Sequence, residues 1–260
     1  MLAGATLCGA CNSSTPPEPK PAASTMARPS ILLVSLDTTR ADSIGPEAVG
    51  VITPAFNGLA ARGRRFTQAY ATVPETLPSH TSMMTGLYPA GHGVHENARS
   101  VSTDHALVAE RLHEAGYRTA AFVSSFALAR RFGLARGFDV YDDELPRGRA
   151  ERGSEETTRR AIGFLLPRTS QPTLMWVHYY DPHAPYAPPE PFRTQYAKKP
   201  YLGEIAAMDQ QLGRLVAAFE QAASQPVAVI VVADHGEGLG APGGSPGWTR
   251  RGCYNGRNQG

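Results

Sequence analysis

The chain has 260 residues, of which 42% are hydrophobic, and its formal net charge at pH 7 is +2. This length and composition can bury one large core, or a core with an appended smaller lobe. Charges of both signs are interspersed, which excludes the basic surface of a nucleic-acid-binding protein. The three cysteines, Cys8, Cys11 and Cys253, lie near the ends of the chain. Neither a disulfide framework nor a cysteine zinc site is therefore expected.

The first eleven residues contain a short apolar stretch with small residues before Cys11. Residues 12–25 are rich in Ser, Thr, Pro and Ala and are too polar to pack. Segment 1–28 resembles a bacterial lipoprotein leader and linker, with Cys11 as the lipidated residue. It predicts a periplasmic or otherwise extracytoplasmic protein tethered to a membrane. The alternative is a disordered cytoplasmic tail, with Met26 as the true start and a cytoplasmic protein.

Between residues 29 and 239, strand-like and helix-like patterns alternate. Short runs of apolar, β-branched residues are typical of strands buried in a parallel sheet. Four such runs occur, over 31–36, 117–123, 173–178 and 227–233. Amphipathic spacing and a proline in a first turn are typical of helices. Such segments cover 54–64, 105–115, 155–166 and 204–220.

The last of these helices carries an apolar stripe that predicts a core-facing side. The stripe consists of Ile205, Met208, Leu212, Leu215 and Phe219. Strands that alternate with helices predict an α/β fold with a mostly parallel central sheet and helices on both of its faces. We therefore expect segment 29–239 to form one α/β domain.

Acidic residues follow two of the predicted strands. Asp37 comes directly after the first strand, and Asp234, His235 and Glu237 follow the last. Ligands in parallel sheets gather beyond the carboxyl ends of the strands, so these residues are expected to converge. Carboxylate oxygens with one imidazole suit a divalent cation, although a lone Asp after a strand is more often a turn former or helix cap.

Two further segments could carry chemistry. Thr76 precedes a Pro-Ser pair that can start a helix, whose N-terminus would favour an anion and support Thr76 as a nucleophile. His183 lies in a proline-rich loop after a strand, where an imidazole could protonate a leaving alkoxide. Taken singly, the Thr76 segment is better explained as an ordinary capped helix, and the His183 loop is explained equally well as a rigid loop with an incidental histidine.

In this order, the segments resemble the sulfatase branch of the alkaline phosphatase superfamily. The matching stretches are 35–42, 76–80 with 85–89 and 92–94, 181–186, and 233–237. The resemblance implies an alkaline phosphatase-like α/β sandwich that hydrolyses a sulfate or phosphate ester through a covalent intermediate. It also implies one divalent metal ion, Ca²⁺, Mg²⁺, Mn²⁺ or Zn²⁺, and a small anionic ester as substrate.

From the motifs and this resemblance we assign roles to eight residues. The catalytic residues are expected to be Thr76, His80 and His183, and the substrate-binding residues Ser79 and His178. The metal ligands are expected to be Asp37, Thr76, Asp234 and His235.

Four positions depart from the family pattern. Thr76 stands where sulfatases have the Cys or Ser that becomes formylglycine, and a threonine cannot form that aldehyde hydrate. His80 replaces the usual Arg, and Thr38 replaces a second Asp. Residues 123–126 replace a Gly-Lys-Trp-His stretch. Since threonine nucleophiles are familiar among relatives that act on phosphoesters, a phosphate substrate is favoured.

Three functions stay open. The leading one is a metal-dependent hydrolase of sulfate or phosphate esters that uses Thr76. The second is an envelope phosphoryl-group transferase or phosphodiesterase with the same site, and the third is a catalytically inactive anion-binding domain. Residues 240–260 are rich in Gly and poor in aliphatic residues, so they predict a disordered or out-of-frame tail. We therefore expect a chain that lacks the C-terminal part of the fold and is inactive as written; a naturally short variant is the alternative.

Overall fold

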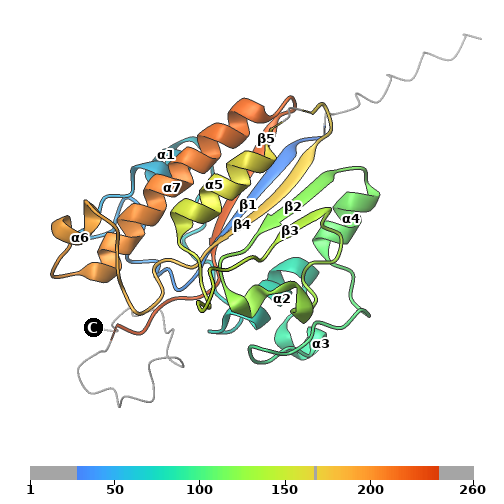
Figure 1. Cartoon of the computed structure of the whole chain (residues 1–260), viewed down its shortest axis with the longest axis horizontal. Coiled ribbons are helices and arrows are strands. Elements are labelled where there is room, and N and C mark those ends of the chain that lie inside the picture. Colours follow the sequence, from blue (N-terminus) through green and yellow to red (C-terminus); the bar gives the residue numbers. More distant parts are fainter. Residues whose placement is uncertain (1–27, 167–168, 240–260) are drawn as a thin grey trace, which may run out of the picture.

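The computed structural model describes residues 28–166 and 169–239 of the chain (Figure 1). Both the proposed lipidation site at Cys11 and the Gly-rich segment 240–260 lie outside these residues. None of the helices in the described part of the chain is long and apolar enough to span a membrane.

The described residues form a five-stranded sheet in which every strand pair is parallel, so the predicted parallel α/β fold is confirmed. The strand order is β3-β2-β4-β1-β5. The strands are β1 (Ser30–Leu36), β2 (Arg118–Phe122), β3 (Val140–Asp142), β4 (Thr173–Tyr179) and β5 (Val227–Ala233). Strand β1 is thus flanked by β4 and β5, and its end lies beside theirs.

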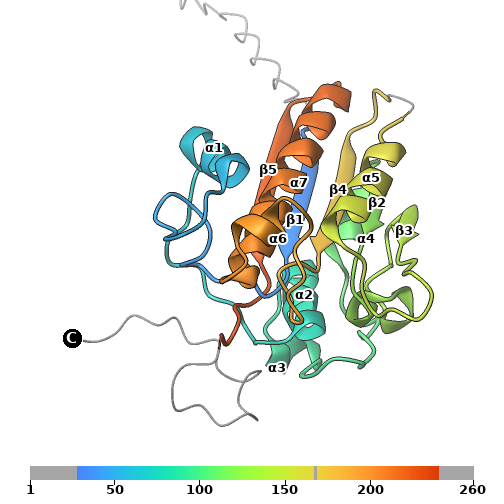
Figure 2. The ribbon, with the colours of Figure 1, turned by 60° about the vertical axis from the view of Figure 1, so that its left-hand side comes forward.

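Helices cover both faces of the sheet (Figures 1 and 2). Helices α1, α5 and α7 lie on one face, and α2 and α4 lie on the other, while α3 follows α2 and α6 precedes α7. Their bounds are α1 Pro54–Arg62, α2 Thr76–Thr85, α3 Pro89–His92, α4 Val108–Glu114, α5 Ser154–Phe164, α6 Phe192–Gln195 and α7 Pro200–Ala222. Two short 3₁₀ turns span Phe126–Leu128 and Arg130–Phe132.

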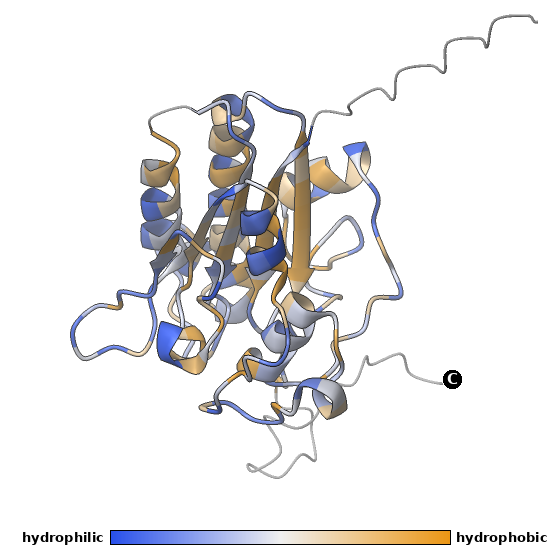
Figure 3. Ribbon diagram, turned by 90° about the vertical axis from the view of Figure 1, so that its right-hand side faces the viewer, coloured by the Kyte–Doolittle hydropathy of each residue, from blue (hydrophilic) through white to orange (hydrophobic). Residues whose placement is uncertain are grey.

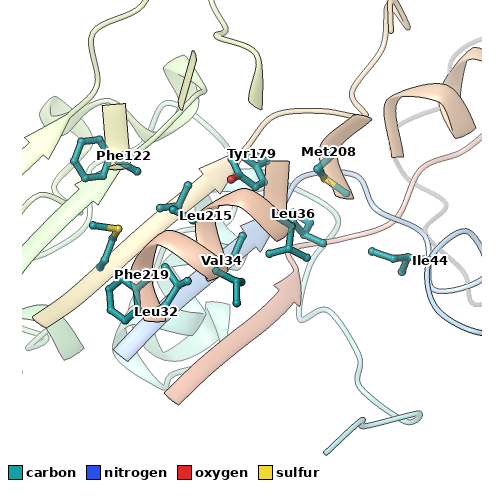
Figure 4. Close-up of a cluster of buried hydrophobic side chains, with 14 of the residues drawn as sticks. Leu32, Val34, Leu36, Ile44, Phe122, Tyr179, Met208, Leu215 and Phe219 are labelled. Carbon is teal, nitrogen blue, oxygen red and sulfur yellow. The ribbon is translucent and has the colours of Figure 1, made fainter. Parts of the chain in front are cut away.

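The two faces of the sheet bury separate apolar clusters. On one face, alternate β1 residues such as Leu32 and Val34 pack with α7 residues such as Leu215 (Figure 4). On the other, Trp176 of β4 packs with Leu77 of α2. Figure 3 shows that the strands are predominantly hydrophobic. All five residues of the predicted α7 stripe are at most 1% exposed, which confirms its core-facing side.

Some boundaries differ from the predictions. Helix α7 begins at Pro200 rather than at residue 204, because a proline fits the first helical turn, where no intrahelical N–H bond is needed. Strand β3 was not predicted, since its three residues are too few to show a period. Helix α2 ends at Thr85 and is capped by Gly86, whose φ of 74° is the left-handed conformation that glycine adopts without strain.

Candidate active site

Two aspartates stand at the ends of neighbouring strands. Asp37 follows β1 and Asp234 follows β5, and both side chains are fully buried. Main-chain hydrogen bonds fix both positions: Asp37 N donates to Tyr179 O at 2.9 Å, and Asp234 N donates to Leu36 O at 3.2 Å. The sheet itself therefore brings together two carboxylates that are almost two hundred residues apart in sequence.

His235 lies against both carboxylates. Its Nε2 is 3.6 Å from Asp37 Oδ1 and 3.5 Å from Asp234 Oδ2. One ligand atom from each of these three residues falls within 4.8 Å of the others. In the described part of the chain, Asp37 Oδ1 and Asp234 Oδ2 accept no hydrogen bond although both are buried. Buried anionic oxygens without donors are costly, and a divalent cation between them would supply the missing partner.

The two carboxyl groups differ in proton affinity. Burial raises the pKa of Asp37, but the adjacent imidazoles, His178 first, lower it by more, so it lies below its usual value. Burial and the charge of Asp37 raise the pKa of Asp234 well above its usual value. Two carboxylates this close resist ionising together, unless a cation lies between them. The donor set therefore fits a divalent metal ion.

Thr76 opens helix α2 beside this pair. Its Oγ1 donates to Asp37 Oδ2 at 3.5 Å, and the residue is buried. Asn97 holds the start of the helix, because its Oδ1 accepts a 2.8 Å hydrogen bond from Leu77 N. Ser79 joins α2 to the end of β5 through a 2.7 Å hydrogen bond from its Oγ to Asp234 O. These hydrogen bonds hold the start of the helix, so Thr76 lies in a fixed position beside the carboxylates. The predicted contact between Ser79 and the substrate stays a prediction.

Both ring nitrogens of His80 form hydrogen bonds within the protein. Its Nδ1 is 2.7 Å from Thr76 O and its Nε2 is 2.9 Å from Ser35 Oγ. A carbonyl only accepts, so Nδ1 carries the proton and Nε2 accepts from Ser35. Burial lowers the pKa of His80 to about 3, so the ring is neutral at pH 7. His80 supports the main chain at Thr76, and its catalytic role stays a prediction.

His178 and His183 lie at different depths. His178, on β4, is fully buried, and its Nε2 is 3.4 Å from Asp37 Oδ2. His183 is half-buried in the loop after β4, where its Nδ1 lies 2.8 Å from Tyr180 Oη and its ring stacks on that tyrosine. The role of His183 as the acid that protonates the leaving alkoxide stays a prediction.

Two site residues were missed by the sequence-based assignment. Ser124, after β2, lies 3.2 Å from His178 Nδ1 through its Oγ. Thr38 has a φ of 48°, a strained value for a β-branched residue, and its buried Oγ1 has no hydrogen-bond partner among the described residues. The sequence marked both positions only as departures from the family pattern, Thr38 in place of a second Asp and Ser124 within residues 123–126, and gave neither a role. Their positions after strands β1 and β2 are the signal that could have assigned them to the site.

A model of the sulfatase family matches residues 29–258. The chain belongs to the sulfatase family. The uncharacterized sulfatase YidJ of Escherichia coli (strain K12) is 24% identical over 292 residues, which cover 83% of this chain and 59% of that protein. This sulfatase-family chain therefore spans less than two thirds of that relative's length.

Solved structures show the same fold. The phosphonate monoester hydrolase of Agrobacterium radiobacter aligns with a TM-score of 0.66 and 21% identity, over 81% of this chain and 63% of that one. A protein in the alkaline phosphatase superfamily from Vibrio parahaemolyticus aligns with a TM-score of 0.65 and 21% identity, over 86% and 59%. The predicted alkaline phosphatase-like fold is confirmed.

Proposed function

We propose that the protein is a metal-dependent hydrolase of phosphate or sulfate esters that forms a covalent intermediate on Thr76. One observation carries the proposal: the Thr76 hydroxyl, at the start of α2, lies 3.5 Å from a buried carboxylate of a site that also contains Asp234 and His235. A helix start favours the anion that develops there. Membership of the sulfatase family supports ester hydrolysis as the reaction class.

Each site residue has a separate role in the proposed reaction. Asp37, Asp234 and His235 would hold a divalent cation, which would supply charge to stabilise the attacking oxygen and the phosphoryl or sulfuryl group. Thr76 Oγ1 directs its proton to Asp37 Oδ2 and forms a bond to the phosphorus or sulfur, as the bond to the leaving oxygen breaks. The leaving alkoxide takes a proton from His183, and water then cleaves the Thr76 ester.

The nucleophile type favours phosphate over sulfate. Sulfatases of the usual kind need an aldehyde hydrate made from Cys or Ser, and Thr76 cannot provide it. A threonine alkoxide can attack phosphorus directly and leave a phosphothreonine for water to hydrolyse. The similarity to a phosphonate monoester hydrolase is compatible with this choice.

Turnover of a substrate panel tests the proposal. Aryl sulfate, phosphate monoester, phosphodiester and phosphonate substrates are offered to the full-length protein with added Ca²⁺, Mg²⁺, Mn²⁺ or Zn²⁺. We expect metal-dependent hydrolysis of a phosphoester, and we expect Thr76→Ala to lower kcat by about 10³-fold or more. The matched control is Thr85→Ala, at the far end of the same helix, which should keep its activity. Substantial turnover by Thr76→Ala would rule out the covalent mechanism.

A further inference from the structure

A tyrosine of α7 holds the turn that follows β1. Tyr201 lies in the first turn of α7 and is buried. Its Oη accepts a 2.9 Å hydrogen bond from Arg40 N and donates a 2.9 Å hydrogen bond to Thr38 O. The direction of both bonds is fixed, because a main-chain N–H only donates and a carbonyl oxygen only accepts. One hydroxyl group therefore joins the two sides of the turn, although Tyr201 and Arg40 are 161 residues apart in sequence.

The turn needs this support because its backbone is strained. Thr38 has a φ of 48°, and a β-branched residue without support favours negative φ. Burial raises the pKa of Tyr201, so the hydroxyl keeps the proton that it donates to Thr38 O. Both hydrogen bonds of Tyr201 go to main-chain atoms of the turn, and they stabilise the conformation in which Thr38 is left-handed.

The same turn fixes the carboxylate of Asp234. Thr38 N donates to Asp234 Oδ1 at 3.2 Å, and His235 N donates to the same oxygen at 2.7 Å. Both donors are main-chain N–H groups, so neither can lose its proton. Oδ1 is thus held by the main chain, while Oδ2 has no hydrogen-bond partner among the described residues and is the oxygen left for an ion. A shift of the turn would move the Thr38 N–H and let the carboxylate rotate.

We propose that Tyr201 is a positioning residue for the candidate metal site: its hydroxyl holds the turn after β1, and this turn holds Asp234 with Oδ2 towards the ion. The inference rests on the proposed metal site. Groups that orient metal ligands typically change metal affinity by about 10–100-fold when they are lost. Tyr201 acts through the main chain of the turn, so it is neither a ligand nor a substrate contact.

Two measurements on the purified 260-residue chain test the inference. Hydrogen exchange over residues 37–43, followed by mass spectrometry without metal, reports how firmly the turn is held. Calorimetric titration with Ca²⁺ and, separately, with Zn²⁺ reports metal affinity. The variant is Tyr201→Phe, which removes the hydroxyl and keeps the ring. The matched control is Tyr141→Phe on β3, because the buried Tyr141 also donates its Oη proton to a main-chain carbonyl, Leu128 O at 2.7 Å.

We expect Tyr201→Phe to speed exchange over residues 37–43, since the Arg40 N–H loses its acceptor, and to weaken binding of both metals by about 10-fold or more. Tyr141→Phe should leave both quantities unchanged. Thr38→Gly gives a second check, because glycine adopts a φ of 48° without strain. With Thr38→Gly in place, Tyr201→Phe should weaken metal binding less than it does in the parent chain. Thermal unfolding without metal confirms that each variant folds.

Unchanged exchange over residues 37–43 in Tyr201→Phe would overturn the inference. So would faster exchange with unchanged metal affinity, because the turn would then not hold the site. An equal loss of affinity with and without Thr38→Gly would overturn the route through the turn. If the parent chain binds neither metal, the proposed metal site itself is overturned, and the exchange rates then decide separately whether Tyr201 holds the turn.

Discussion

Two regions of the molecule bury carboxylates, and their surroundings differ. At the ends of β1 and β5, Asp37 and Asp234 face imidazoles from His178 and His235 at 3.4 to 3.6 Å. On α7, Glu204 is 5% exposed and lies under the proline-rich loop, where its Oε1 accepts a 2.6 Å hydrogen bond from Ala187 N. Its Oε2 has no hydrogen-bond partner among the described residues.

The difference separates a binding site from a structural contact. Burial raises the pKa of Glu204 to about 8, so its carboxyl group is mostly neutral at pH 7 and ties the loop to α7 through one main-chain N–H. Asp37 keeps a pKa below its usual value despite complete burial, because imidazoles surround it. A buried carboxyl group alone therefore does not indicate a metal. Two of them within reach of one imidazole, as at Asp37, Asp234 and His235, form a group that could hold a metal ion.

The largest expected effect is on metal binding. Asp234→Asn combined with His235→Ala should remove a bound divalent ion, because an amide supplies far less charge to a hard cation than a carboxylate does. Elemental analysis of the purified protein measures this. Glu204→Gln is the matched control and should retain the ion of the parent protein. A parent protein that is well folded and free of metal would contradict the view that the Asp37 and Asp234 region, unlike Glu204, is a metal site.

A smaller effect is expected on the pH dependence of stability. The pKa of Glu204 is raised from 4.5 to about 8 in the folded state, so its ionisation opposes folding increasingly as the pH rises from about 4.5 to 8. Glu204→Gln keeps the acceptor for Ala187 N and cannot ionise. It should match the parent near pH 4.5 and be more stable by about 4 kcal/mol near pH 8. Urea unfolding at both pH values measures this, and an equal difference at the two would contradict it.

The smallest effect concerns the link between α2 and β5. Ser79→Ala removes the 2.7 Å hydrogen bond to Asp234 O and leaves that buried carbonyl without this donor. The free energy of unfolding should fall by about 1–2 kcal/mol. Urea unfolding measures it, with Ser82→Ala, on the same helix, for comparison. No change in stability would mean that the hydroxyl does not tie the helix to the strand.

The sequence predicted the parts of the site that follow strand ends. Asp37, Asp234 and His235 come directly after long apolar runs, and the parallel sheet brings such ends together whatever their separation in sequence. Thr76 was found because a Pro-Ser pair marks a helix start. These signals are local, so they can be read without the fold.

The supporting residues could not be predicted in this way. Ser124 acts through a contact with β4, and Thr38 is distinguished by its backbone conformation rather than its residue type. The depth of His178 was also hidden, since a strand-end histidine is compatible with both a substrate contact and a buried position. Such features depend on packing between strands, which residue patterns do not report.

Isolation of the covalent intermediate tests the central claim most directly. The full-length protein is mixed with a phosphoester substrate and its metal, quenched in acid within one turnover, digested and analysed by mass spectrometry. The account predicts the mass of one phosphoryl group on the peptide that contains Thr76, and none in Thr76→Ala. Robust turnover with an unmodified Thr76 peptide at every quench time, or with the phosphoryl group on another residue, would contradict it.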